Sequence, residues 1–195
     1  MERIFNIQNV KSIEQRAFAG TNIESFTIPN GVNCIPEYAF TRTYSLKSVA
    51  CHDGVRFVQS NAFKSSGIEK FDWPLSCKEI PDFCFQDCQS LSDLSVCDGL
   101  TSVGQYAFSG SGISHFDWPK TCDKIPSGCF YNSKLKNMVI PPNVKDIGKY
   151  AFANCHELDC VDLTSLVFCC CDKEAFSYSE KAEISMPYYD CLLMK

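Results

Sequence analysis

The stretch Leu135–Cys155, LKNMVIPPNVKDIGKYAFANC, contains the pattern that decides the fold. Its apolar residues follow a fixed order: L-x-x-M-x-I-P, then V-x-x-I, then A-F. The same order recurs along the chain, and each copy ends on a phenylalanine, at Phe18, Phe40, Phe63, Phe85, Phe108, Phe130, Phe152 and Phe176. A short unit that repeats at a fixed period buries its apolar face only by stacking on its neighbours. The pattern therefore predicts a solenoid.

A longer period runs through the same chain. The segment Gly67–Phe85, GIEKFDWPLSCKEIPDFCF, matches Gly112–Phe130, GISHFDWPKTCDKIPSGCF, at an offset of 45 residues. Two successive units together form this longer repeat. Trp73 and Trp118 occupy a column that holds Ile28 or Ile140 in other copies, so we expect both indoles to be buried.

These columns resemble the BspA-like leucine-rich repeats of bacterial surface proteins and protist proteins. The I-P step, the V-x-x-I-G segment, the A-F pair and the trailing cysteine of Leu135–Cys155 carry the resemblance, which covers nearly the whole chain. It implies an α/β right-handed solenoid, with a parallel sheet of short strands on the concave face and helical or 3-10 turns on the convex side. We expect one domain over residues 1–195, of about eight rungs of 22–24 residues, in which 177–195 is a degenerate C-terminal rung or cap.

Charge and hydropathy exclude several classes of function. The net charge is -5, and no cluster of Lys and Arg is present of the kind that supplies most of the affinity for nucleic acid. No apolar run reaches the roughly 18 to 20 residues of a membrane helix, so we expect no membrane insertion. The first residues, MERIFNIQNVKSIEQ, carry charges and no apolar core, unlike a secretory signal.

The 14 cysteines stand mostly in core columns. Cys84 and Cys129 replace the alanine before phenylalanine, and Cys77 and Cys122 replace an aliphatic residue, so each is expected to act as a small buried hydrophobe. Stacked rungs lie about 4.8 Å apart, which puts residues two rungs apart beyond the reach of a disulfide. Free thiols favour an intracellular location, in cytoplasm or nucleus, with the cell surface as the alternative.

Neither a metal site nor an active site is predicted. The group around Cys169–Cys171, with Cys155, His156 and Cys160, lacks the paired C-x2-4-C spacing of structural zinc sites. The sequence contains no phosphate-binding loop, nucleophile elbow or H-E-x-x-H motif. We therefore expect no catalysis, no cofactor and no metal.

The open face of the sheet remains as the place for function. Because strand side chains alternate, residues between the apolar ones should point to solvent. The charged or titratable members form the predicted protein-binding surface: Lys70, Asp72, Asp93, His115, Asp117 and Asp162. This mildly acidic surface would suit a basic or polar protein partner.

We therefore predict a non-enzymatic protein-interaction module that binds its partner through this face. A subsidiary hypothesis is regulation of a Ser/Thr protein phosphatase of the type 1 class, and the alternative is a cell-surface adhesin that binds host cells or extracellular matrix. The apolar C-terminal end predicts a homodimer interface, unless the tail folds back over the last rung; its residues are Tyr188, Tyr189, Leu192 and Leu193.

Overall fold

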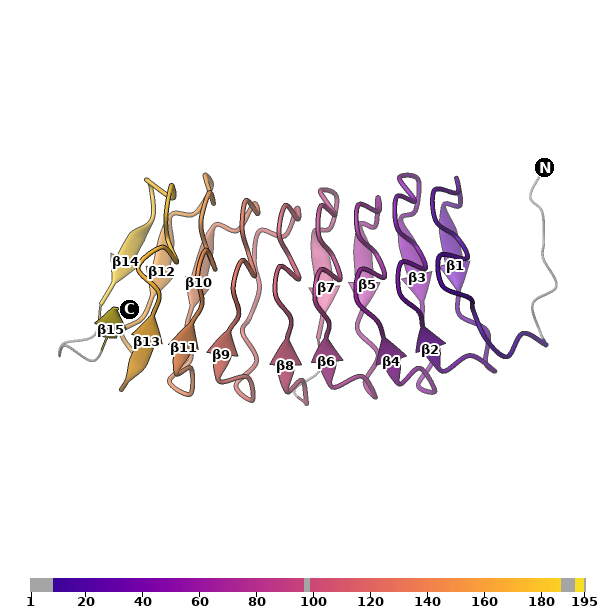
Figure 1. Cartoon of the computed structure of the whole chain (residues 1–195), viewed down its shortest axis with the longest axis horizontal. Helices are drawn as coiled ribbons and strands as arrows, with labels where there is room; N and C mark the ends of the chain where they lie inside the picture. Colours follow the sequence, from indigo (N-terminus) through magenta and orange to yellow (C-terminus); the bar gives the residue numbers. More distant parts are fainter. Residues whose placement is uncertain (1–8, 97–98, 187–191, 195) are drawn as a thin grey trace.

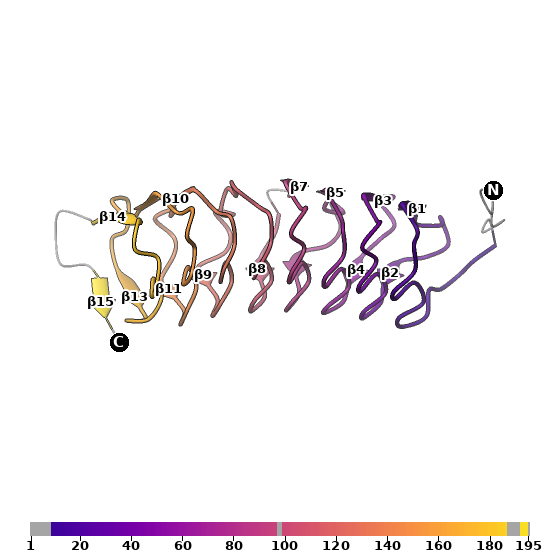
Figure 2. The ribbon, with the colours of Figure 1, turned by 90° about the horizontal axis from the view of Figure 1, so that it is seen from above.

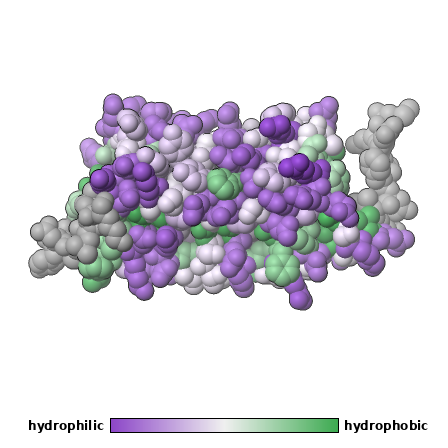
Figure 3. All heavy atoms as spheres, in the orientation of Figure 1, coloured by the Kyte–Doolittle hydropathy of each residue, from purple (hydrophilic) through white to green (hydrophobic). Residues whose placement is uncertain are grey.

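The chain forms a parallel-strand solenoid of about seven turns. The computed structural model describes residues 9–96, 99–186 and, for the backbone alone, 192–194. Successive coils follow one another along a single long axis, with the N-terminal and C-terminal parts at opposite ends (Figures 1 and 2). Hydrophilic residues cover most of the side seen in Figure 3, with hydrophobic residues scattered between them.

Most coils contribute a three-residue strand to the first line of parallel strands. These strands are β1 (Ser25–Thr27), β3 (Ser48–Ala50), β5 (Lys70–Asp72), β7 (Asp93–Ser95), β10 (Asn137–Val139), β12 (Cys160–Asp162) and β14 (Glu183–Ser185). The line is divided into two sheets, β1-β3-β5-β7 and β10-β12-β14. The coil between them, which contains His115 and Asp117, has no strand at this place.

A second line of strands comes from the V-x-x-I part of the repeat. It contains β2 (Cys34–Ile35), β4 (Phe57–Val58), β6 (Glu79–Ile80), β8 (Ser102–Val103), β9 (Lys124–Ile125), β11 (Asp146–Ile147), β13 (Cys169–Cys171) and β15 (Leu192–Met194). These strands form the sheets β2-β4, β6-β8 and β9-β11-β13-β15. Neighbouring coils thus pair at two separate places along much of the solenoid, with breaks between the sheets of each line (Figure 1).

The A-F part of the repeat forms consecutive turns, and the helical or 3-10 convex side expected from the resemblance is wrong for the residues that the structure describes. Residues two before and two after the phenylalanines repeatedly have positive φ, for example Tyr38 (φ 58) and Arg42 (φ 56) around Phe40. This alternation points every second amide at the next coil. Phe40 N donates to Ala62 O at 2.8 Å, and Arg42 N donates to Lys64 O at 3.0 Å. A helix would keep these amides within its own coil.

The phenylalanine column fills the centre of the solenoid. Ring centroids of successive phenylalanines lie 5.1 to 5.9 Å apart, from Phe18 to Phe176, and all seven neighbouring pairs are stacked. The six rings from Phe40 to Phe152 have no solvent exposure. This continuous column confirms that the units bury their apolar faces on one another.

The C-terminal end closes the second line of strands. Strand β15 pairs in parallel with β13, in the register Cys169↔Leu192 and Cys170↔Leu193. The predicted interface residues Tyr188 and Tyr189 lie outside the described residues, as do the side chains of Leu192 and Leu193. The homodimer therefore stays a prediction.

Candidate functional site

The outer side of the first strand line is the surface that the sequence analysis singled out. We call it the open face and define it by the outward residues of these coils: Ser25, Thr27, Ser48, Ala50, Lys70, Asp72, Asp93, Ser95, His115, Asp117, Asn137, Val139, Cys160 and Asp162. All of them are exposed or half-buried, while the residues between them are buried, as Val49 and Phe71 are, or partly buried, as Phe26 and Leu94 are. The alternation predicted from the sequence is confirmed.

Three of the predicted charged residues meet on β5 and β7. Lys70 Nζ lies 3.1 Å from Asp93 Oδ2, and the two residues are direct partners in the strand register. Both side chains are more than half exposed, so water screens this pair and it contributes little to stability. The hydrogen bond to Asp93 and the negative charge of Asp93 raise the pKa of Lys70. Asp72, opposite Ser95, has no ion-pair partner among the described residues and leaves a negative charge on the face.

His115 and Asp117 lie on the next coil, where the strand line is interrupted. His115 Nε2 is 3.2 Å from Asp117 Oδ1, so this pair forms within one coil and not between coils. The Asp117 side chain is 94% exposed, which leaves its second oxygen open to a partner. The side chains project outward as predicted, although their segment is not the strand that the sequence analysis expected.

Asp162 differs from the other predicted residues, because its carboxylate is occupied locally. Oδ1 accepts hydrogen bonds from Thr164 N at 2.8 Å and from Thr164 Oγ1 at 2.6 Å. These bonds lower the pKa of Asp162. The geometry is that of an aspartate that caps a turn. Asp162 is also separated from His115 and Asp117 by the β10 coil, so the structure does not bring it to their cluster.

Two pockets open on the face, each beside an Asp-Trp-Pro step. The larger, of 560 Å³, occupies the interruption of the strand line and is lined by Leu94, Ser95, Val96, His115, Phe116, Asp117, Trp118, Pro119 and Lys120. The smaller, of 240 Å³, is lined by Cys51, His52, Asp53, Asp72, Trp73, Pro74, Leu75, Ser95 and Val96. Ser95 and Val96 border both pockets, which therefore adjoin. The sequence analysis missed the pockets, although the repeated D-W-P step was visible at Asp72–Pro74 and Asp117–Pro119.

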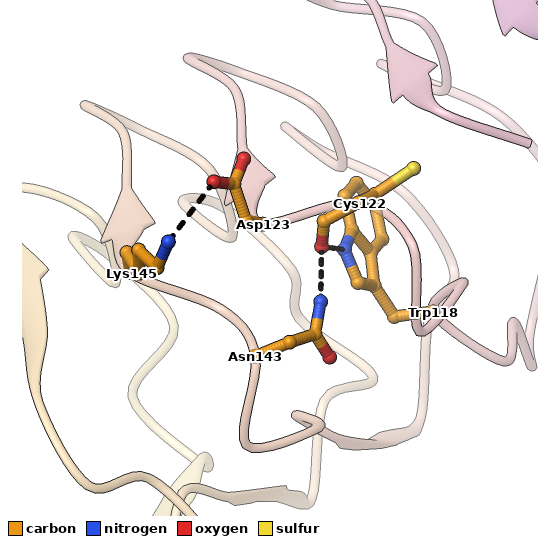
Figure 4. Close-up of polar contacts among 5 residues, drawn as sticks. All are labelled: Trp118, Cys122, Asp123, Asn143 and Lys145. Carbon is orange, nitrogen blue, oxygen red and sulfur yellow. Dashed lines mark hydrogen bonds and ion pairs between the residues drawn. The ribbon is translucent and has the colours of Figure 1, made fainter.

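The two tryptophans shape these pockets from within. Trp73 and Trp118 are only 3% and 4% exposed, which confirms the predicted burial. The indole Nε1 of Trp118 donates to Cys122 O at 3.0 Å, and Asn143 Nδ2 donates to the same oxygen at 2.9 Å (Figure 4). Trp73 makes the equivalent bond to Cys77 O at 3.1 Å. With both indole N–H groups already bonded, the rings form a rigid floor and are not free anchors for a partner.

The cysteines are free thiols wherever the structure describes them. Cys77, Cys84, Cys122 and Cys129 are buried, as their columns predicted. Burial raises the pKa of Cys51, which borders the smaller pocket, to about 12, so this thiol is not an activated nucleophile. The cysteines around Cys170 form no metal site in the described part of the chain, where no group of three His, Cys, Asp or Glu could hold an ion. No helix among the described residues is long and apolar enough to span a membrane.

Stacked coils, a parallel sheet with an open face and a phenylalanine core define a leucine-rich-repeat protein. The family model described as the BspA type leucine rich repeat region (6 copies) matches residues 11–134 and 123–189. The chain belongs to this family. No curated protein matches it.

Solved bacterial structures share the fold. A leucine-rich repeat protein from Bacteroides ovatus has a TM-score of 0.64 at 22% identity, over 94% of this chain and 60% of its own length. A leucine rich cell surface protein from Faecalibacterium prausnitzii has a TM-score of 0.53 at 17% identity, over 93% of this chain and 70% of its own. The leucine-rich repeat protein of T. pallidum has a TM-score of 0.54 at 22% identity, over 78% and 62%. The chain thus spans about three fifths of the length of the first of these structures.

Proposed function

We propose that the chain is a protein-interaction module that binds its partner on the open face, with the two adjoining pockets at the centre of the contact. The carrying observation is the interrupted strand line between β7 and β10, where a pocket of 560 Å³ lies beside the exposed His115–Asp117 pair. An interface needs recesses for anchoring side chains as well as area, and the pockets supply them.

The charges of the face favour a partner with basic groups. Asp72 and Asp117 border different pockets, while Lys70 is already neutralised by Asp93. A lysine or arginine of the partner that reached either carboxylate would speed association and select the partner. The apolar walls formed by Leu94, Val96 and Pro119 would accept the carbon chain of the same residue.

The test is a pull-down from native extract with the wild type and with the double variant Asp72→Lys/Asp117→Lys. Both side chains are exposed, so the variant is expected to fold normally. A partner that binds the wild type should be lost from the variant. The matched control is Glu157→Lys/Glu180→Lys, which makes the same charge change at exposed residues outside the open face. If all three proteins retain the same partners, the open face is not the binding surface.

Two finer functions follow from the sequence and need their own assays. Regulation of a type 1 Ser/Thr phosphatase predicts inhibition of the catalytic subunit at micromolar concentrations of this protein, and unchanged phosphatase activity would refute it. The adhesin alternative is supported by the name of the Faecalibacterium relative, a cell surface protein. It predicts binding to host cells or matrix and an exported chain that tolerates oxidation, whereas an intracellular regulator would keep free thiols and be found in cytoplasm or nucleus.

A further inference from the structure

A pocket formed by the turns of the A-F segments is lined by several positively charged side chains. It has a volume of 440 Å³ and is lined by Arg16, Ala19, Gly20, Tyr38, Thr41, Arg42, Lys64 and Ser65. Three of these residues are cationic and none is acidic, in a chain of net charge -5. The lining comes from the turns around Phe18, Phe40 and Phe63, and so from three consecutive coils.

The repeat explains why these side chains converge. Gly20, Arg42 and Ser65 each stand two residues after a phenylalanine, and all three have positive φ. Small residues at Gly20 and Ser65 leave space on both sides of Arg42. A Cβ placed on Gly20 would meet no atom within 4 Å, which shows that the pocket is open above this residue.

The three cations have no ion pair with a carboxylate among the described residues, in contrast to four lysines elsewhere in the solenoid. Lys70, Lys124, Lys145 and Lys149 each lie within 3.6 Å of an aspartate or glutamate oxygen. 

Arg16 and Lys64 are placed instead by aromatic rings. The Arg16 guanidinium lies 5.0 Å from the centre of the Tyr38 ring, and Lys64 Nζ lies 5.8 Å from the centre of the Phe83 ring. Such contacts hold a cation in place and leave its N–H donors free. Glu37, next to Tyr38 in sequence, does not line the pocket, and its carboxylate accepts a hydrogen bond from Gln15.

We propose that this pocket binds an oxyanion, a phosphate or sulfate group carried as an ester by its ligand. The backbone amides around it already bond to the next coil, as in Gly20 N to Thr41 O at 2.9 Å and Ser65 N to Gln86 O at 2.7 Å. Recognition therefore rests on the side chains of Arg16, Arg42 and Lys64. Charge-assisted hydrogen bonds from arginine to such a group are the strong kind, and salt screens them because the site is open.

Isothermal titration calorimetry of the full chain at low salt tests the proposal with two probes, inorganic tripolyphosphate and a heparin-derived sulfated disaccharide. Binding of tripolyphosphate alone identifies a phosphate site, and binding of the disaccharide alone identifies a sulfate site. Binding of both identifies a site that recognises negative charge without distinguishing the two oxyanions. Each of these results supports the proposal. If neither probe gives heat of binding at millimolar concentration, the proposal is overturned.

Variants then locate the binding. Arg42→Asn removes one charge and keeps a residue that tolerates the left-handed backbone, and it should weaken binding about tenfold. The matched control is Arg56→Asn, at an exposed arginine outside the pocket, which should leave affinity unchanged within about twofold. Equal losses in both variants would place the anion elsewhere.

A second pair of variants separates the pocket from the overall charge and remains informative if Arg42→Asn folds poorly. Gly20→Asp and Gly20→Asn have nearly the same shape, and both suit the positive φ of this position. The aspartate would supply the missing carboxylate to the three cations and should reduce affinity at least about tenfold more than the asparagine does. Equal affinity of the two variants contradicts the proposal.

Discussion

The coils Gly67–Phe85 and Gly112–Phe130 are copies of one sequence, yet they differ on the surface. Their interiors agree. The ring centres of Trp73 and Phe85 lie 6.1 Å apart, as do those of Trp118 and Phe130, and the interplanar angle is 68° in both pairs. Outside, the first copy contains β5, which pairs with the strands on both sides, whereas the second copy has no strand in the same place. A pocket of 560 Å³ occupies the gap.

The polar contacts of the two copies differ as well. Lys70 has Asp93 directly opposite on the following strand and forms an ion pair with it. The corresponding residue of the second copy is His115, which bonds to Asp117 of its own coil. The two copies thus share the packing of their interior and differ in the contacts on the open face. The larger pocket of the candidate site lies beside the second copy, at the interruption of the strand line.

The largest effect is expected from Trp73→Ala and Trp118→Ala, which test whether the two interiors are equivalent. Each substitution removes a buried indole and its bond to a cysteine carbonyl, and each should lower the free energy of unfolding by about 3 to 5 kcal/mol. Urea unfolding measures both. The two losses should agree to within about 1 kcal/mol, and a much smaller loss for Trp118 would show that the pocket has loosened the core beneath it.

Thiol modification gives a second test of equivalent interiors. Cys84 and Cys129 are fully buried, and burial raises the pKa of both well above its usual value. At pH 8 both are protonated and shielded, so a disulfide reagent should modify them only through unfolding, and at equal rates. Peptide mapping after partial modification measures the rates. The reference is Cys160, which is half-buried on the open face and should react first.

The interior could be predicted from the sequence because each coil repeats it. The phenylalanine column, the buried tryptophans and the buried cysteines follow from the type of residue and its position in the unit. The outward set followed from strand alternation, which holds even where the coil at His115 has no strand.

The turns and the second strand line could not be predicted in the same way. Tyr38, Phe83 and Tyr150 have positive φ, which bulky residues rarely adopt. At Phe83 this conformation directs the amide to the next coil, where it donates to Gln105 O at 2.9 Å. Gly128 also depends on a neighbouring coil, because a Cβ there would clash with the Tyr106 ring of the preceding coil. The V-x-x-I segments are short, and their apolar residues predict only core positions. The sequence therefore does not predict that these segments pair as the second line of strands. Both features depend on contacts between coils.

Amide hydrogen exchange should separate the two copies at the surface. Trp73 N donates to Ser95 O at 2.8 Å, whereas Trp118 N has no acceptor among the described residues. The Trp118 amide should therefore exchange at least about tenfold faster, since no bond must open first. Exchange followed by NMR measures both amides in one sample. Equal protection would mean that the strand line closes in solution and that the larger pocket is transient.

The smallest effect is expected from an attempt to repair the interruption. A spacing of 22 residues sets His115 beside Asn137, so the double variant His115→Lys/Asn137→Asp copies the Lys70–Asp93 arrangement into the gap. The new pair would be exposed, so the unfolding temperature should rise only slightly. The informative measurement is exchange at the Trp118 amide, which should slow toward that of Trp73 if the missing cross-strand pair keeps the gap open. Unchanged exchange would mean that the missing pair does not cause the gap. The cause would then lie in the preceding coil, where Val96 borders both pockets.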